Sequence, residues 1–105
     1  MTQQKRLSDW FHRHGGKVTV NRAAVRASEE MTELLESVSV WNSETPPADC
    51  LEEVADVYLC LLLVADLLGG DLHEAAERKM DKNDARTWRV DETGALYHVK
   101  ESKSS

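Results

Sequence analysis

One predicted helix constrains the fold more than any other feature of the chain. From about Ala48 to Leu68 the apolar side chains cover nearly the whole helical circumference, rather than one stripe. Such a helix must be buried on all sides, and the other helices that a 105-residue chain can form are too short to enclose it. We therefore expect an identical subunit to cover its free side, in a homodimer or a homotetramer.

Three further helices and a hairpin are expected around this element. Apolar residues at three- and four-residue spacings predict helices over about residues 2–13, 22–41 and 72–87. We expect Asn21 to cap the second of these helices, whose inner stripe should consist of Val25, Ser28, Met31, Leu34 or Leu35, Val38 and Trp41. From Trp88 the period changes and indicates a short β-hairpin that ends near residue 99, followed by a polar, flexible tail at 100–105. The prediction is one all-α domain at residues 1–99, an antiparallel four-helix, bundle-like fold with a C-terminal hairpin.

Composition excludes several classes of protein. The longest uncharged apolar run, Val57 to Ala65, is about half of the ~18 residues that a membrane-spanning helix needs, and the N-terminus lacks a signal-peptide pattern. We expect a soluble, cytoplasmic protein that binds no membrane. Cys50 and Cys60 have no metal-site spacing and are interpreted as buried thiols. A net charge of −6 makes nucleic acid an improbable partner.

The acidic residues are concentrated in the middle of the chain. No Lys or Arg occurs from Ala27 to Glu77, where there are 13 acids, and the flanks carry 13 bases against 6 acids. The net charge of −6 is therefore the sum of −13 and +7. This division indicates a cation site with anion-binding groups at its edges.

Two pairs of carboxylates sit at helical spacing inside this acidic stretch. Glu30 and Glu33 are three residues apart, as are Glu53 and Asp56, so each pair should share one face of its helix. The second pair lies on the helix that is expected to be buried, where ionised carboxylates are costly without a cation. Oxygen-only ligands favour Mg²⁺ bound together with substrate phosphates. The alternative is a Glu-rich helix face that is simply solvated.

These residues match a known family. The sequence Glu29-Glu30-x-x-Glu33, followed after nineteen residues by Glu53-x-x-Asp56, resembles the EExxE…ExxD pattern of MazG-like nucleoside triphosphate pyrophosphohydrolases, an all-α superfamily. Downstream, Lys79-Met80-x-Lys82-Asn83-x-x-Arg86 is similar to the basic end of the family's next helix, and residues 88–98 to its short hairpin. The resemblance covers roughly residues 22–99.

The resemblance implies Mg²⁺-dependent hydrolysis of nucleoside triphosphates, deoxynucleotides foremost, to the monophosphate and pyrophosphate, which would control a nucleotide pool. Mn²⁺ would be a possible substitute. The implied metal ligands are Glu30, Glu33, Glu53 and Asp56. Glu29 would be a supporting carboxylate, and with Glu30 and Glu33 it would form the catalytic group. Glu33 or Glu30 could accept the proton of the attacking water.

The basic residues after the acidic stretch would bind the substrate. Lys79, Lys82 and Arg86 are three and four residues apart and should form a stripe that holds the β and γ phosphates, with Asn83 beside them. Lys and Arg near a helix C-terminus are also favoured without any ligand. Arg26 could order a carboxylate or contact a phosphate.

Some alternatives remain open at this level. The same fold could act on another phosphorylated nucleotide, such as ppGpp, dUTP or dUDP, or phosphoribosyl-ATP. The chain could also be a non-catalytic helical dimer with an acidic partner-binding face. Candidates for stacking on, or hydrogen bonding to, a base are Trp10, Trp41, His14 and Asn21, although the two tryptophans are on apolar stripes typical of core positions.

Overall fold

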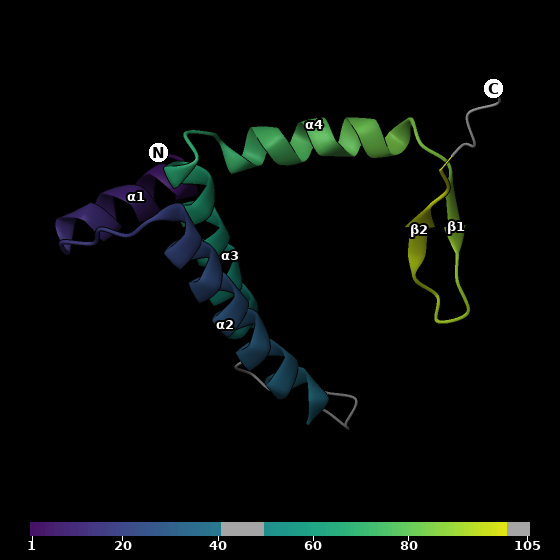
Figure 1. Cartoon of the computed structure of the whole chain (residues 1–105), viewed down its shortest axis with the longest axis horizontal. Helices are drawn as coiled ribbons and strands as arrows, with labels where there is room; N and C mark the ends of the chain where they lie inside the picture. Colours follow the sequence, from purple (N-terminus) through teal and green to yellow (C-terminus); the bar gives the residue numbers. More distant parts are fainter. Residues whose placement is uncertain (41–49, 101–105) are drawn as a thin grey trace. The chain divides into compact units, whose positions relative to one another are not determined.

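The computed structural model describes residues 1–40 and 50–100 of the chain. These residues form α1 (Gln3–Arg13), α2 (Val20–Ser39), α3 (Cys50–Leu67), α4 (Leu72–Asp84) and a hairpin of β1 (Trp88–Val90) and β2 (Leu96–His98) (Figure 1). The predicted all-α fold with a C-terminal hairpin is confirmed. The chain divides into two compact units, residues 1–72 and residues from 73 onward, which are described separately.

Two parts of the sequence-based prediction lie outside the described residues. They are the segment 41–49, which contains Trp41 and the expected start of the third helix, and the tail from residue 101. Within the described residues, no helix is both long enough and apolar enough to cross a bilayer.

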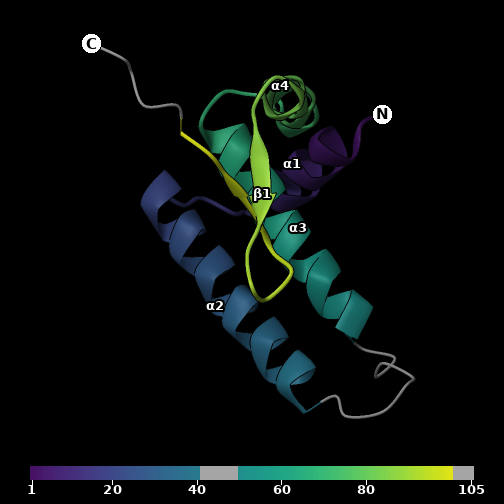
Figure 2. The ribbon, with the colours of Figure 1, turned by 90° about the vertical axis from the view of Figure 1, so that its right-hand side faces the viewer.

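The first unit is built on the antiparallel pair α2 and α3, which lie side by side in two perpendicular views (Figures 1 and 2). The contact is close because α2 presents small residues at helical spacing. Ala23 and Ala27 are buried on α2, and Leu62 of α3 is only 2% exposed. Alanine side chains let two helix backbones approach, so the packed seam continues along α2 to the next position on that face, Glu30.

The predicted inner stripe of α2 is wrong for the packing within this chain. Its larger apolar members Val25, Met31 and Val38 stay 41–44% exposed, whereas the face of Ala23, Ala27 and Glu30 is turned inward. The period of the pattern was identified correctly, but side-chain size decides which face lies against α3. The small residues permit the close contact with α3, and the larger apolar side chains lie on a different face of α2.

Helix α2 also begins earlier than predicted. The residue before its first turn is Thr19, whose hydroxyl accepts a hydrogen bond from the Arg22 backbone N–H at 3.1 Å. Asn21, the expected cap, is already inside the helix. A threonine oxygen satisfies the free N–H groups of a first turn much as an asparagine does, and the two candidates are only two residues apart.

Helix α1 packs on α3 through few but specific contacts. Thr2 caps its N-terminus by accepting a hydrogen bond from the Lys5 backbone N–H. The Ser8 hydroxyl donates to Asp66 on α3 at 2.9 Å. These contacts place the first helix beside the C-terminal half of α3.

The turn between α3 and α4 is closed by a side chain from the start of the protein. The Gln4 amide nitrogen donates to the Gly70 carbonyl at 2.6 Å, and the Gln4 amide oxygen accepts from the Leu72 backbone N–H at 2.8 Å. One carboxamide thus satisfies a carbonyl after the end of α3 and an N–H at the start of α4.

The second unit contains α4 and the hairpin. Helix α4 ends at Asp84 rather than near Thr87, because the Ala85 and Arg86 N–H groups donate to carbonyls three residues back, a tighter turn than an α-helix makes. The strands pair antiparallel with Arg89 opposite Tyr97. Asp91 organises the connecting turn by accepting hydrogen bonds from the N–H groups of Thr93 and Ala95 and from the Thr93 hydroxyl.

Helix α3 is not enclosed by the described residues of its own chain. Leu62 is its one buried residue in that part of the structure. Four larger apolar or aromatic side chains, spaced three, four and three residues apart, are 44–76% exposed: Leu51, Val54, Tyr58 and Leu61. Residues at this spacing form a continuous apolar seam along one side of a helix.

Candidate metal centre

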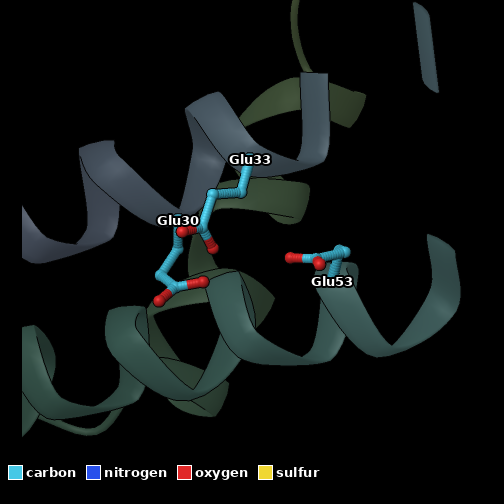
Figure 3. Close-up of side chains that lie close together, drawn as sticks. All are labelled: Glu30, Glu33 and Glu53. Atoms are coloured by element: carbon cyan, nitrogen blue, oxygen red, sulfur yellow. The ribbon is translucent and has the colours of Figure 1, made fainter. Parts of the chain in front are cut away.

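Three carboxylates converge between α2 and α3. Glu30 and Glu33 project from α2 and Glu53 from the facing part of α3, all toward the space between the helices (Figure 3). Each contributes one oxygen to a group in which all three atoms lie within 4.8 Å of one another. The antiparallel pairing of the helices therefore brings together the two acidic motifs, which are nineteen residues apart in the sequence.

Glu30 is the buried member of the cluster, with 6% of its surface exposed. Its Oε1 atom pairs with Arg26 one turn earlier, while Oε2 is buried and has no hydrogen-bond partner among the described residues. Burial, followed by the neighbouring Glu33 carboxyl, raises the pKa of Glu30, although Arg26 acts in the opposite direction. A second positive charge next to Oε2 would relieve this unfavourable environment.

Glu29 has a different environment from its neighbour. Its two oxygens accept hydrogen bonds from Arg22 and Arg26, each at 3.2 Å. The hydrogen bond from Arg22, followed by that from Arg26, lowers the pKa of Glu29. A carboxylate held in its charged form by two guanidinium groups is a weak proton acceptor, so this geometry favours a supporting role for Glu29 over that of a base.

Arg26 bridges Glu29 and Glu30 and therefore orders carboxylates, one of the two roles that the sequence left open for it. Arg22 was missed in the sequence analysis. It lies seven residues before Glu29, two turns along the same helix face, and this spacing was the available signal.

Asp56, the fourth predicted ligand, is exposed and does not belong to the group of three carboxylates. Its negative charge nevertheless contributes to the raised pKa of Glu30. Cys60, one turn further along α3, is half-buried, and burial raises the pKa of its thiol, with a contribution from the charge of Glu30. The two cysteines were interpreted as buried thiols, and the structure has both only half-buried.

The cluster has the chemical properties of a site for a hard divalent cation. Its donors are carboxylate oxygens from two helices, and a buried Glu30 oxygen has an unused acceptor site. Mg²⁺ and Mn²⁺ favour such oxygen donors and retain positions for water or phosphate when the protein supplies only a few carboxylates. The chain thus fits a divalent metal cofactor.

Apart from Arg26 on α2, the predicted phosphate-binding residues lie in the second unit. Lys79 and Lys82 are exposed on α4, whereas Asn83 and Arg86 are partly buried. Because α4 ends at Asp84, Arg86 follows the helix instead of continuing its basic stripe.

The structure describes three of the four residues considered for base recognition, Trp10, His14 and Asn21, all in the first unit. Trp10 is 50% exposed, contrary to the expectation of a core position, and lines a groove of about 420 Å³ between α1 and α3. His14 ends α1, with its ring 5.1 Å from that of Trp10. Asn21 is exposed on the first turn of α2.

Comparisons with known proteins agree on one group of relatives. No protein-family model matches the chain. A dATP/dGTP diphosphohydrolase of Salmonella phage PMBT28 is 32% identical over 96 residues, which make up 91% of this chain but only 30% of that protein. A dATP/dGTP diphosphohydrolase of cyanophage S-2L is 36% identical over 74 residues, or 70% of each chain.

A solved structure gives the same result. The cyanophage S-2L MazG-like pyrophosphohydrolase, bound to dGDP and three catalytic Mn²⁺ ions per active site, superposes with a TM-score of 0.73 at 30% sequence identity. The match covers 94% of this chain and 91% of that chain, so it includes residues of both units.

Proposed function

The chain belongs to the MazG-like pyrophosphohydrolases, hydrolases of nucleotide phosphoric anhydrides, and on this premise we propose that it hydrolyses deoxynucleoside triphosphates to the monophosphate and pyrophosphate with Mg²⁺ as cofactor. The convergence of Glu30, Glu33 and Glu53 carries the proposal. Purine deoxynucleotides are the preferred class, because two relatives are named for dATP and dGTP. The reaction would serve the cytoplasmic nucleotide pool.

Each carboxylate has a distinct part in this proposal. Glu30, Glu33 and Glu53 would hold the cation, with the exposed Asp56 as the fourth proposed ligand. When bound, Mg²⁺ acidifies water and neutralises phosphate charge. Glu33 is the exposed member of the group and has room to accept the proton of the attacking water.

The arginines of α2 would keep the site in order. Arg26 pairs with Glu30 and prevents the buried carboxylate from turning away from the cluster. Glu29 and Arg22 in turn hold the guanidinium of Arg26 along the helix. Lys79, Lys82 and Arg86 supply cations suited to the β and γ phosphates.

The exposed apolar seam of α3 is the basis for proposing a homodimer. Leu51, Val54, Tyr58 and Leu61 form an exposed apolar surface that a second copy would bury around a two-fold axis. Leu61→Glu should then shift the protein to a monomer in sedimentation experiments. Leu68→Glu is the control, because Leu68 is equally apolar but lies beyond the end of α3.

The direct test is a comparison of two neighbouring glutamates. Glu53→Gln removes a charged donor from the cluster, whereas Glu52→Gln makes the same change at an exposed position outside it. We expect Glu53→Gln to lose at least 100-fold in Mg²⁺-dependent pyrophosphate release and to lose the rise in melting temperature that Mg²⁺ gives the native protein. Full activity in Glu53→Gln would refute the assignment.

The products identify the reaction. Phosphorus NMR of reactions with triphosphates should detect pyrophosphate and no orthophosphate. Deoxynucleoside diphosphates should be tested as substrates in the same experiment, since the solved relative is bound to dGDP. Orthophosphate as the first product would contradict cleavage between the α and β phosphates.

A further inference from the structure

A second groove lies wholly within the C-terminal unit. It has a volume of about 560 Å³ and is lined by residues from the last turn of α4, the connection to the hairpin and both strands: Met80, Asn83, Asp84, Arg86, Trp88 and Leu96. Its volume is in the range of small-molecule sites, and its walls combine apolar surface with a few polar groups.

Trp88 is held in place at the wall of this groove. Its indole N–H donates to the Asn83 backbone carbonyl at 2.8 Å, which fixes the ring against the end of α4. The His98 ring lies 5.7 Å away on the paired strand, tilted by 48°, and does not line the groove. An indole that is 37% exposed and anchored at its polar edge is a rigid platform for a planar ligand.

The Asn83 side chain indicates which hydrogen-bonding group a planar ligand in this groove should carry. Its amide nitrogen contacts the Met80 sulfur at 3.8 Å, while its Oδ1 atom is buried and has no hydrogen-bond donor among the described residues. A carbonyl oxygen cannot bind a phosphate oxygen, because both are acceptors. The missing partner is therefore a hydrogen-bond donor, and the N–H and amino groups of a base are donors of this kind.

Positive charge is also present at the groove. Arg86 is partly buried in its wall and makes no ion pair with any residue that the structure describes. The groove thus combines an aromatic face, a buried acceptor, the Arg86 cation and the Asp84 carboxylate. A nucleobase that carries N–H donors and is attached to a phosphate group has matching chemistry.

We propose that this groove binds the base of the nucleotide substrate, with Trp88 stacking on the ring and Asn83 Oδ1 accepting a hydrogen bond from a base N–H or amino group. The proposal rests on the proposed hydrolysis of deoxynucleoside triphosphates and adds the specificity-determining residues. Adenine and guanine both carry amino donors and a wide ring for stacking.

The first test measures binding without turnover. In metal-free protein, deoxyadenosine or deoxyguanosine monophosphate should shift the indole N–H signal of Trp88 in a proton–nitrogen NMR spectrum, and deoxyribose 5-phosphate should not. Equal shifts with the base-free sugar phosphate, or no shift with any of them, would overturn the proposal. This readout is independent of catalysis, so it remains decisive even if the protein hydrolyses no nucleotide.

The second test uses kcat/KM for dATP and dGTP. Trp88→Leu retains apolar volume and loses the aromatic face, and should cost roughly five- to 150-fold, whereas Trp88→Phe should cost much less. Tyr97→Ala is the matched control, an exposed aromatic on the paired strand that does not line the groove. Equal losses in Trp88→Leu and Trp88→Phe, or a base-dependent loss in Trp10→Leu instead, would contradict the assignment.

The third test isolates Asn83 through a ratio of substrates. The native protein should prefer dATP over the triphosphate of unsubstituted purine deoxyriboside, which lacks the amino group, by at least about tenfold. Asn83→Ala should remove most of this preference. Because both substrates are measured on one variant, a partial loss of folded protein cancels in the ratio. An unchanged preference would show that Asn83 does not contact the base.

Discussion

Arg26 and Glu30 form an ion pair across one turn of α2 in which the carboxylate is buried and the guanidinium remains exposed to solvent. The Arg26 side chain is 53% exposed, and that of Glu30 is 7% exposed. The buried carboxylate thus depends on a counter-ion that remains in solvent on its other side. The second Glu30 oxygen is buried without a hydrogen-bond partner among the described residues, and Glu30 belongs to the group of three carboxylates, so a metal and Arg26 would both stabilise its charge.

Removal of the arginine should make the protein depend on metal for stability. We expect Arg26→Ala to lower the melting temperature in metal-free buffer, because Glu30 would be buried without its counter-ion. Saturating Mg²⁺ should then raise the melting temperature of Arg26→Ala by more than it raises that of the native protein. Arg22→Ala is the control. Among the described residues the Arg22 side chain pairs with Glu29, which is exposed, so we expect a smaller effect. Equal melting temperatures for Arg26→Ala and the native protein without metal would contradict this account.

The hairpin turn should titrate at acidic pH. Hydrogen bonds from Thr93, then from the backbone of Ala95, hold the pKa of Asp91 below its ordinary value of 3.8. A carboxylate whose pKa is lower in the folded state stabilises the fold above its unfolded pKa, and this contribution is lost as the pH falls through the folded pKa. The amide signals of Thr93 and Ala95 should therefore move together below about pH 4.

Asp91→Ala supplies the control for that titration. The variant should abolish the common titration of the two amides and leave the hairpin frayed at neutral pH. Amide signals that stay constant down to pH 2 in the native protein would contradict the proposed role of Asp91.

The close packing of α2 on α3 should be sensitive to the size of Leu62. This side chain is 2% exposed, so Leu62→Ala should cost about 2–5 kcal/mol of unfolding free energy, through lost burial and the cavity that remains. Leu68→Ala makes the same chemical change at a position that is 69% exposed and should cost far less. Urea unfolding followed by circular dichroism measures both. Similar losses in the two variants would indicate that Leu62 is not the centre of the contact.

The turn after α1 should tolerate no side chain at one glycine. A Cβ atom on Gly16 would lie 2.5 Å from the Phe11 ring, so Gly16→Ala must displace a half-buried aromatic side chain. We expect a loss of about 1–3 kcal/mol, typical of overpacking. Gly70→Ala is the matched control, because its Cβ would meet nothing within 4 Å. Thermal unfolding of the two variants tests the difference, and equal stability would contradict the contact.

Much of the fold and of the proposed site could be predicted because both depend on local periodicity. Helix positions follow from apolar spacing, and carboxylates three residues apart share a face in any helix. The seam of α2 could not be predicted, because Ala23 and Ala27 contribute little to an apolar pattern and yet decide which face packs on α3. Glu30 is the buried acid because it lies on the same face of α2 as these two alanines.

Two other features depend on contacts that a linear pattern does not encode. The end of α4 is set by a tight turn at Asn83 and by the indole of Trp88, which bonds the Asn83 carbonyl. The groove beside Trp88 exists only because the hairpin folds back on this turn. The sequence therefore predicts that Asn83 binds substrate but does not associate Trp88 with it.

The bridge made by Gln4 has a consequence for the order of folding. The turn between α3 and α4 is only a few residues long, yet its two ends are joined by a residue 66 and 68 positions away. Such a contact adds the entropy cost of a long loop to a turn that would otherwise form early. We expect the Leu72 amide to acquire protection from hydrogen exchange only after α1 has docked on α3, so that the first helix of the chain controls when its last helix begins.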